Sequence, residues 1–129
     1  MHDRELTRKV RAAVYNQCQK RGYATPVDVL MDLGVLSKQK YEDWRFGRVD
    51  YLERVCTINL RKLSLIMRQI RVYAGEKGLK PSLSVYKQWG RNKGSQMSKP
   101  LRFSKSGNAD MEKWYATHFV EPKRTKSRA

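Results

Sequence analysis

The stretch YLERVCTINLRKLSLIMRQIRVYA, residues 51–74, decides the fold. Its apolar residues recur at spacings of three and four positions, which is the period of one face of an α-helix. We therefore predict one long helix over 51–74, and Asp50 and Glu53 have the spacing of a capping box at its start. The buried face would consist of Leu52, Val55, Cys56, Asn59, Leu60, Leu63, Ile66, Met67, Ile70, Tyr73 and Ala74.

A second apolar row runs along nearly the opposite side of this predicted helix and consists of Ile58, Leu65 and Val72. A helix that is apolar on two sides is typical of the central helix of a bundle. In the alternative interpretation, the second row is the seam of a homodimer. Between the rows lie four arginines, the first three of them seven positions apart: Arg54, Arg61, Arg68 and Arg71.

The stretch YEDWRFGRVDYLE, residues 41–53, leads into the long helix and overlaps a short helix predicted over about 38–46. Gly47 would end this short helix. Tyr41 and Trp44 are three positions apart and therefore share one side of the helix. We expect both rings to anchor it in the core.

Residues 26–33 predict another short helix, joined to 38–46 by a turn that contains Gly34. Two short helices in this order have the general shape of a DNA-binding helix-turn-helix, in which 38–46 would read the bases. The candidates for base contacts are Lys38, Lys40 and Arg45. Glu42 and Asp43 lie on the same helix and would repel phosphates, so a plain helical corner is an equal alternative.

The remaining segments complete a predicted all-α domain over 1–120, with five to six helices around the long central one. Residues 3–21 read as a helix, and another short helix is expected between Ser82 and Gly90. The segment NADMEKWYATHFV begins as a helix and ends in a β-prone THFV, and a small irregular or β element could pair 101–104 with 117–120. Residues 121–129 read as a disordered basic tail.

The charge balance is strongly basic. The 129 residues include 28 Lys and Arg against 12 Asp and Glu, a net charge of +16. Such an excess indicates a polyanionic partner, with nucleic acid first and an anionic membrane second. No apolar run approaches the length of a membrane span and no signal peptide is visible, so we expect a cytoplasmic protein with no membrane partner. Cys18 and Cys56 are expected to be reduced and buried.

Residues 86–105 combine aromatic rings with cations and contain no acid. Cations track phosphates, and rings stack on unpaired bases. We expect Tyr86 and Trp89 to be mostly buried on one helical face, which leaves the loop cations for contact.

Catalysis is not indicated by the residue pattern. A metal-dependent nuclease needs clustered carboxylates, but Glu42 and Asp43 are adjacent and would point about 100° apart on a helix. Asp50 and Glu53 are assigned to a cap, and His118 with the two cysteines lacks zinc-ligand spacing. We therefore predict a non-enzyme without cofactor or metal. A small nuclease, or a basic partner of an acidic protein, is the second alternative.

The combination of YEDWRFGRVDYLE, of GLKPS with VYKQWG, and of LRFSKSG with YATHFV resembles a family of small uncharacterised bacterial proteins. The resemblance covers about 41–120. It implies a bacterial, cytosolic origin, and no functional residue is carried over from it.

The sequence thus predicts a non-enzymatic nucleic-acid-binding protein, with duplex DNA slightly favoured. The predicted phosphate contacts are Arg4, Arg8, Arg11, Arg61, Arg68, Arg91, Lys93, Lys99 and Arg102. An RNA-binding or ribosome-associated protein that uses the patch at 86–105 is the first alternative.

Overall fold

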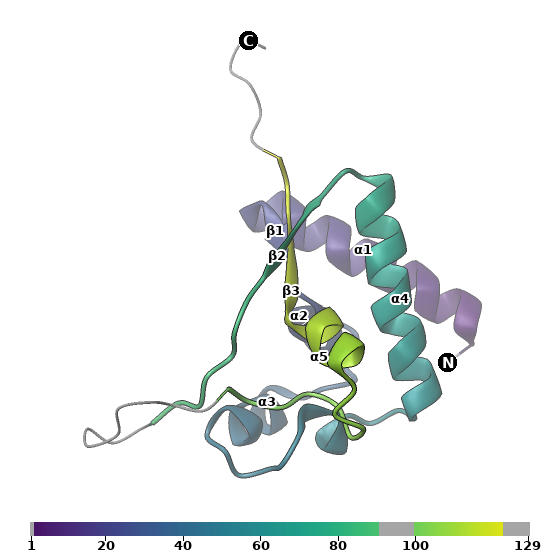
Figure 1. The fold of residues 1–129 in the computed structure, drawn as a ribbon. Helices are drawn as coiled ribbons and strands as arrows, with labels where there is room; N and C mark the ends of the chain where they lie inside the picture. The colour runs from purple at the N-terminus through teal and green to yellow at the C-terminus, as the bar shows by residue number, and fades with distance from the viewer. Residues whose placement is uncertain (1, 91–99, 123–129) are drawn as a thin grey trace.

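A computed structural model describes residues 2–90 and 100–122 (Figure 1). The predictions for Arg91, Lys93, Lys99 and most of the basic tail therefore lie outside the described residues. The elements are, in chain order, α1 (Asp3–Arg21), β1 (Tyr23–Ala24), α2 (Pro26–Asp32), α3 (Lys38–Arg45), the 3₁₀-helix η1 (Leu52–Val55), α4 (Leu60–Glu76), β2 (Lys80–Leu83), α5 (Ala109–Ala116) and β3 (Thr117–Val120).

The domain is mostly helical, but a three-stranded antiparallel sheet corrects the prediction of a purely α-helical fold. The strand order is β1-β3-β2, so the strand nearest the C-terminus is the central one. β3 pairs with β1 through Tyr23 opposite Val120, and with β2 through Lys80 opposite Val120. The sheet joins three segments that are far apart in the chain.

The predicted β-prone segment at 117–120 is confirmed as β3, but its predicted partner at 101–104 is wrong. Residues 101–104 have no regular structure. The helix expected between Ser82 and Gly90 is also wrong, since its first residues belong to β2 and the rest is irregular. β2 is an edge strand that contains Pro81, and an edge is where a sheet tolerates a proline.

The predicted long helix over 51–74 is broken into η1 and α4. Residues between them are extended at Cys56, and the N–H of Thr57 donates to the carbonyl of Val35 at 2.9 Å. Asn59 then caps α4 by accepting from the N–H of Lys62 at 2.9 Å. The predicted capping box is wrong, because Glu53 is buried and its carboxylate binds groups elsewhere in the fold.

Side chains of neighbouring residues cap the starts of α2 and α3, and the predicted end of α3 at Gly47 is confirmed. Thr25 accepts from the N–H of Asp28, and Ser37 accepts from the N–H of Lys40, both at 3.1 Å. Gly47 follows α3 with a φ of 77°, a left-handed conformation that favours glycine. Both helices end within one residue of the predicted bounds.

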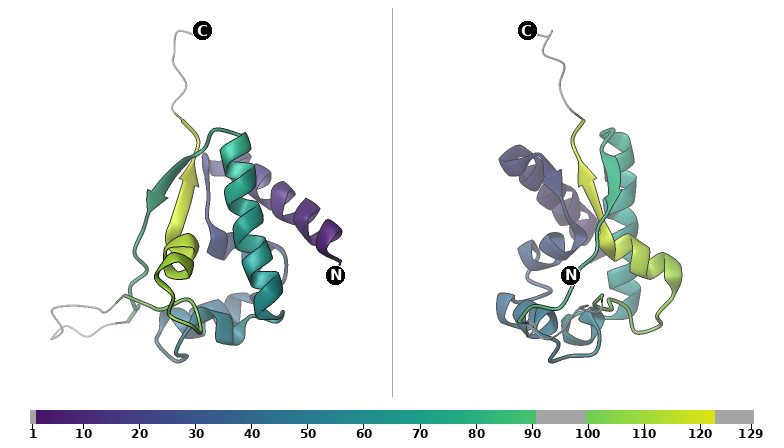
Figure 2. Two further views of the ribbon diagram at one scale, coloured as in Figure 1. Left: turned by 45° about the vertical axis from the view of Figure 1, so that its right-hand side comes forward. Right: turned by 60° about the vertical axis from the view of Figure 1, so that its left-hand side comes forward.

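The core lies between the helix pair α1/α4 and the remaining elements. Figure 2 shows α1 crossing α4, with the sheet beside them and α5 next to α4. Arg71 of α4 covers the ring of Trp114 of α5 at 3.7 Å, which closes this side of the core. The largest fully buried side chains are Trp44, Tyr115, Leu6, Leu30, Leu36, Leu52, Leu63, Ile66, Met67, Ile70, Val10 and Val14.

The predicted anchor Trp44 is fully buried, and its indole N–H donates to the carbonyl of Arg102 at 2.8 Å. Tyr41 is half-buried beside it. Both cysteines are free, Cys18 buried as predicted and Cys56 only half-buried. The rings therefore fix α3 to the segment around residue 102.

Candidate nucleic-acid interface

Arginines lie on the outward sides of both α1 and α4, and two of them make ion pairs between the helices. Arg61 donates to both carboxylate oxygens of Asp3 at 3.1 Å, and Arg11 donates to Glu76 near the end of α4. These two ion pairs connect the outer edges of the two helices. Residues three or four positions apart share a helix side, as do those seven apart. We name the resulting surface the α1/α4 arginine face: Arg4, Arg8, Arg11, Arg61 and Arg68.

The two ion-paired arginines connect α1 and α4 at the surface, whereas the buried apolar residues between the helices hold them together. The hydrogen bond from Arg61 lowers the pKa of Asp3, and the same contact raises the pKa of Arg61. Arg11 lies over the ring of Tyr73 at 4.6 Å while it pairs with Glu76. Their charges are partly neutralised, so their main effect is to fix the geometry of the face.

The other three arginines of the face, Arg4, Arg8 and Arg68, are exposed. They make no hydrogen bond, ion pair or ring contact with any residue in 2–90 or 100–122. Burial lowers the pKa of the neighbouring Arg71, and the charge of Arg68 lowers it further. The three exposed guanidinium groups therefore add positive charge to the surface of the two helices that also carry Asp3, Glu5 and Glu76.

On α3, the three predicted base-reading residues have different surroundings. Lys38 and Lys40 are exposed on its first turn. Arg45 is half-buried, lies 4.5 Å from the ring centroid of Trp89 and 5.1 Å from that of Tyr86, and donates to the carbonyl of Lys87. The guanidinium of Arg45 thus joins α3 to residues 86–89, whereas both lysines are accessible.

Arg102 is also largely engaged within the fold. Its guanidinium donates to the carbonyls of Ser104 and Lys105 and lies 5.5 Å from the ring centroid of Tyr51. The structure thus does not bring Arg102 to the α1/α4 arginine face. Its carbonyl accepts from the indole N–H of the buried Trp44.

Three of the four acids that the sequence groups at 42–53 make separate contacts in the fold. Asp43 pairs with Arg48 at 3.1 Å and Asp50 with Arg54 at 3.2 Å. Glu53 accepts from the hydroxyl of Tyr115 at 2.7 Å. In the part of the chain that the structure describes, no three His, Cys, Asp or Glu side chains gather in a way that could hold a metal ion.

Two carboxylates hold the irregular segment after residue 102. Glu53 accepts from the N–H of Lys105 at 2.8 Å, and Glu112 accepts from the N–H of Phe103 at 3.0 Å. Glu112 also accepts from the N–H and the hydroxyl of Ser104, both at 2.6 Å. These bonds replace the strand pairing that was predicted for this segment, and they explain why it is fixed without a sheet.

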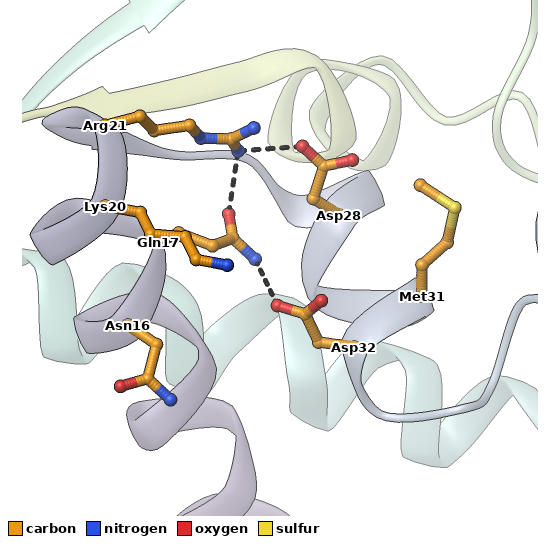
Figure 3. A pocket seen from close by; sticks show the side chains of 7 residues that line it. All are labelled: Asn16, Gln17, Lys20, Arg21, Asp28, Met31 and Asp32. Carbon is orange, nitrogen blue, oxygen red and sulfur yellow. Dashed lines mark hydrogen bonds and ion pairs between the residues drawn. The ribbon is translucent and has the colours of Figure 1, made fainter.

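A small hollow lies between the end of α1 and α2 (Figure 3). Its volume is about 240 Å³, and it is lined by Asn16, Gln17, Lys20, Arg21, Asp28, Met31 and Asp32. Arg21 pairs with Asp28 at 2.7 Å, and Gln17 donates to Asp32 at 2.8 Å. Arg21 also donates to Gln17 at 3.0 Å, so four of the lining residues bind one another and connect the end of α1 to α2.

Next to this hollow, the hydroxyl of Tyr86 lies 3.0 Å from Nε2 of His118. Burial raises the pKa of Tyr86, and burial lowers the pKa of His118. A tyrosine whose pKa is raised is a poor nucleophile, because its anion is disfavoured. The pair therefore connects β3 to the segment after β2 and does not resemble an activated catalytic dyad.

The sequence-based reasoning missed Phe46, which is exposed beside Trp89 with ring centroids 5.5 Å apart. Trp89 itself is more exposed than expected, and it does not share a helical face with Tyr86 because no helix forms there. Phe46 directly precedes Gly47, which ends α3, and this position at the end of a helix indicates an exposed side chain.

No helix among residues 2–90 and 100–122 is both long enough and apolar enough to cross a bilayer. No protein-family model, curated protein or solved structure matches this chain.

Proposed function

We propose that this protein binds nucleic acid without catalysing a reaction, through phosphate contacts from the α1/α4 arginine face, and that duplex DNA is favoured over RNA. The observation that carries the proposal is the set of three exposed arginines, Arg4, Arg8 and Arg68, that pair with no residue in 2–90 or 100–122 and lie on two helices connected by ion pairs at Asp3 and Glu76. Positioned cations on helices bind phosphate without the entropy cost of ordering a loop. A bacterial cytosolic location belongs to the same proposal.

Net charge supports this choice of partner. The chain carries +16, and guanidinium groups match the geometry of phosphate oxygens. The affinity of such a surface comes mainly from counterion release, so it depends strongly on salt and little on base sequence. This is the behaviour expected of a protein that contacts the backbone of a duplex.

A more specific version of the proposal is that α2 and α3 form a helix-turn-helix that contacts bases. Lys38 and Lys40 would then approach the bases from the exposed first turn of α3. Arg45 would take part only after leaving the rings of Trp89 and Tyr86. We therefore assign sequence-independent binding to the α1/α4 arginine face and expect little base discrimination.

The homodimer seam predicted from Ile58, Leu65 and Val72 is not part of this proposal. Ile58 precedes α4, and Leu65 is half-buried against the core, whereas Val72 is exposed. The three residues do not form one continuous apolar row on a single helix.

The test is the salt dependence of binding to a random-sequence DNA duplex. Each lost phosphate contact makes the slope of log affinity against log salt shallower by about 0.9. Replacing Arg4, Arg8 and Arg68 together by alanine should therefore make the slope shallower by about 2.7. The matched control replaces Lys80, Lys105 and Lys113, which are exposed on other elements, by alanine and removes the same charge.

Equal slopes for the two triple variants would show that the α1/α4 arginine face is not the binding surface. A wild-type slope near zero would refute nucleic-acid binding through phosphates altogether, and would favour an acidic protein as partner.

A further inference from the structure

Phe46 and Trp89 form an exposed aromatic pair at the end of the domain opposite the sheet. Their side chains are 39% and 38% exposed, and their rings meet edge to face with centroids 5.5 Å apart. Single exposed rings are common on protein surfaces, but two adjacent large ones from distant segments are less so. Phe46 follows α3, whereas Trp89 belongs to the irregular segment after β2.

Several contacts fix the two rings in place. The N–H of Trp89 donates to the carbonyl of Arg45 at 2.7 Å, and the side chain of Gln88 donates to the carbonyl of Phe46. A Cβ at Gly90 would lie 3.2 Å from the ring of Phe46, so only glycine allows this close approach without displacing the ring. The pair is therefore preorganised before any ligand arrives.

Behind the pair, the rings continue into the core. Tyr41 meets Trp89 edge to face at 5.8 Å, and Arg45 lies over Trp89 at 4.5 Å. Trp44, which is fully buried, lies 6.1 Å from Tyr41. This support makes the exposed rings a rigid surface and not mobile side chains.

The border of the pair carries cations. Arg48 lies over the ring of Phe46 at 4.9 Å, and Lys87 is exposed two residues before Trp89. Asp43 is the acid nearest to Arg48 and pairs with it, while Glu42 is half-buried on α3. Rings that are flanked by cations suit a ligand with both π-faces and negative charge.

We infer that Phe46 and Trp89 form a stacking platform for unpaired bases of a single-stranded nucleic acid, with Arg48 and Lys87 on its backbone. This inference rests on the proposed function and adds a second surface to it. Stacking on rings needs bases that are free of a duplex. The α1/α4 arginine face contacts phosphates of either form, whereas the platform distinguishes single strands from duplexes.

The experiment measures binding of a 12-nucleotide oligothymidine and of a 12-base-pair DNA duplex at one salt concentration. Replacing Phe46 or Trp89 by alanine should weaken single-strand binding roughly 5- to 100-fold. Duplex binding should change less than twofold. Phe46→Leu keeps apolar volume without a ring, so it should lose single-strand binding while preserving the fold if the alanine variant is destabilised.

Fluorescence provides a second readout. Trp89 is the most exposed of the three tryptophans, so single-strand binding should quench the wild-type emission, and the quenching should be lost in Trp89→Phe. Trp89→Phe retains a ring and should bind within about fivefold of the wild type.

The outcomes separate the two proposals. If wild type binds both ligands with a steep salt dependence but Phe46→Leu changes neither, the platform is refuted and the phosphate-binding face stands. Failure of the wild type to bind either ligand refutes the proposed function itself. Equal losses for single strand and duplex would also refute the platform, because they would indicate a general effect on the surface.

Discussion

Removing the hydroxyl of Tyr115 should lower the free energy of unfolding considerably, although only one heavy atom is lost. Tyr115 is fully buried, and its hydroxyl donates to the carboxylate of Glu53 at 2.7 Å. Tyr115→Phe keeps the ring, so packing against Phe103 is preserved. What changes is the number of hydrogen bonds to the carboxylate of Glu53, a residue that is only 8% exposed.

The magnitude follows from the type of bond. A hydrogen bond to a charged group contributes about 1.5–3 kcal/mol, and the buried acceptor that loses its donor keeps its desolvation cost. Among the residues that the structure describes, the N–H of Lys105 is then the remaining donor to the Glu53 carboxylate. We therefore expect a loss of about 2 kcal/mol in the free energy of unfolding.

The assay is urea denaturation followed by circular dichroism. At a typical slope between 1 and 3 kcal/mol per molar urea, this loss lowers the midpoint by roughly 1 M with an unchanged slope. Tyr15→Phe removes the same atom from an exposed tyrosine of α1 and is the matched control. If both variants have the wild-type midpoint, the bond from Tyr115 to Glu53 does not stabilise the fold, and our account of why Glu53 does not form the predicted capping box fails.

Two further predictions concern pH and the start of α4. Burial lowers the pKa of His118 in the folded state below its ordinary 6.5, so folding stability should be fully present above pH 6.5 and fall as pH decreases below it. His118→Gln should remove this fall between pH 7 and 5, and an unchanged pH profile would contradict the burial of the imidazole. Asn59→Ala removes the side chain that caps α4 and should cost about 1 kcal/mol in urea denaturation, whereas Asn16→Ala, on exposed α1 surface, should cost little.

Sequence reasoning succeeded where the deciding contacts are local. Thr25 and Ser37 bind N–H groups three residues ahead, and Gly47 relieves strain at its own position. The bounds of α1, α2 and α3 follow from such signals. The exposure of Arg4 and Arg8 follows likewise from the spacing of apolar residues on one helix.

Where the deciding partner is distant, the sequence was misleading. The capping box at Asp50 and Glu53 fitted the local pattern. In the fold, however, the carboxylate of the buried Glu53 accepts from the hydroxyl of Tyr115, which is sixty-two residues away. The register of β3 is likewise set by β1 and β2, and neither is its neighbour in the chain. No local pattern contains this information.

At the candidate site, too, local features could be predicted from the sequence and contacts between distant residues could not. The sequence identified the arginines but not which of them are neutralised, since Asp3 pairs with Arg61 and Glu76 pairs with Arg11 across two helices. Phe46 became a candidate only when the fold placed Trp89 beside it.

The place of β3 at the centre of the sheet affects the order in which the protein can fold during translation. β1 and β2 are synthesised long before Thr117–Val120, yet neither pairs with the other. Until β3 leaves the ribosome, both strands have unpaired backbone groups, and α5, which precedes β3 directly, cannot yet be fixed by the sheet. The domain is therefore expected to complete its fold in one late step, after nearly all of its helices have been made.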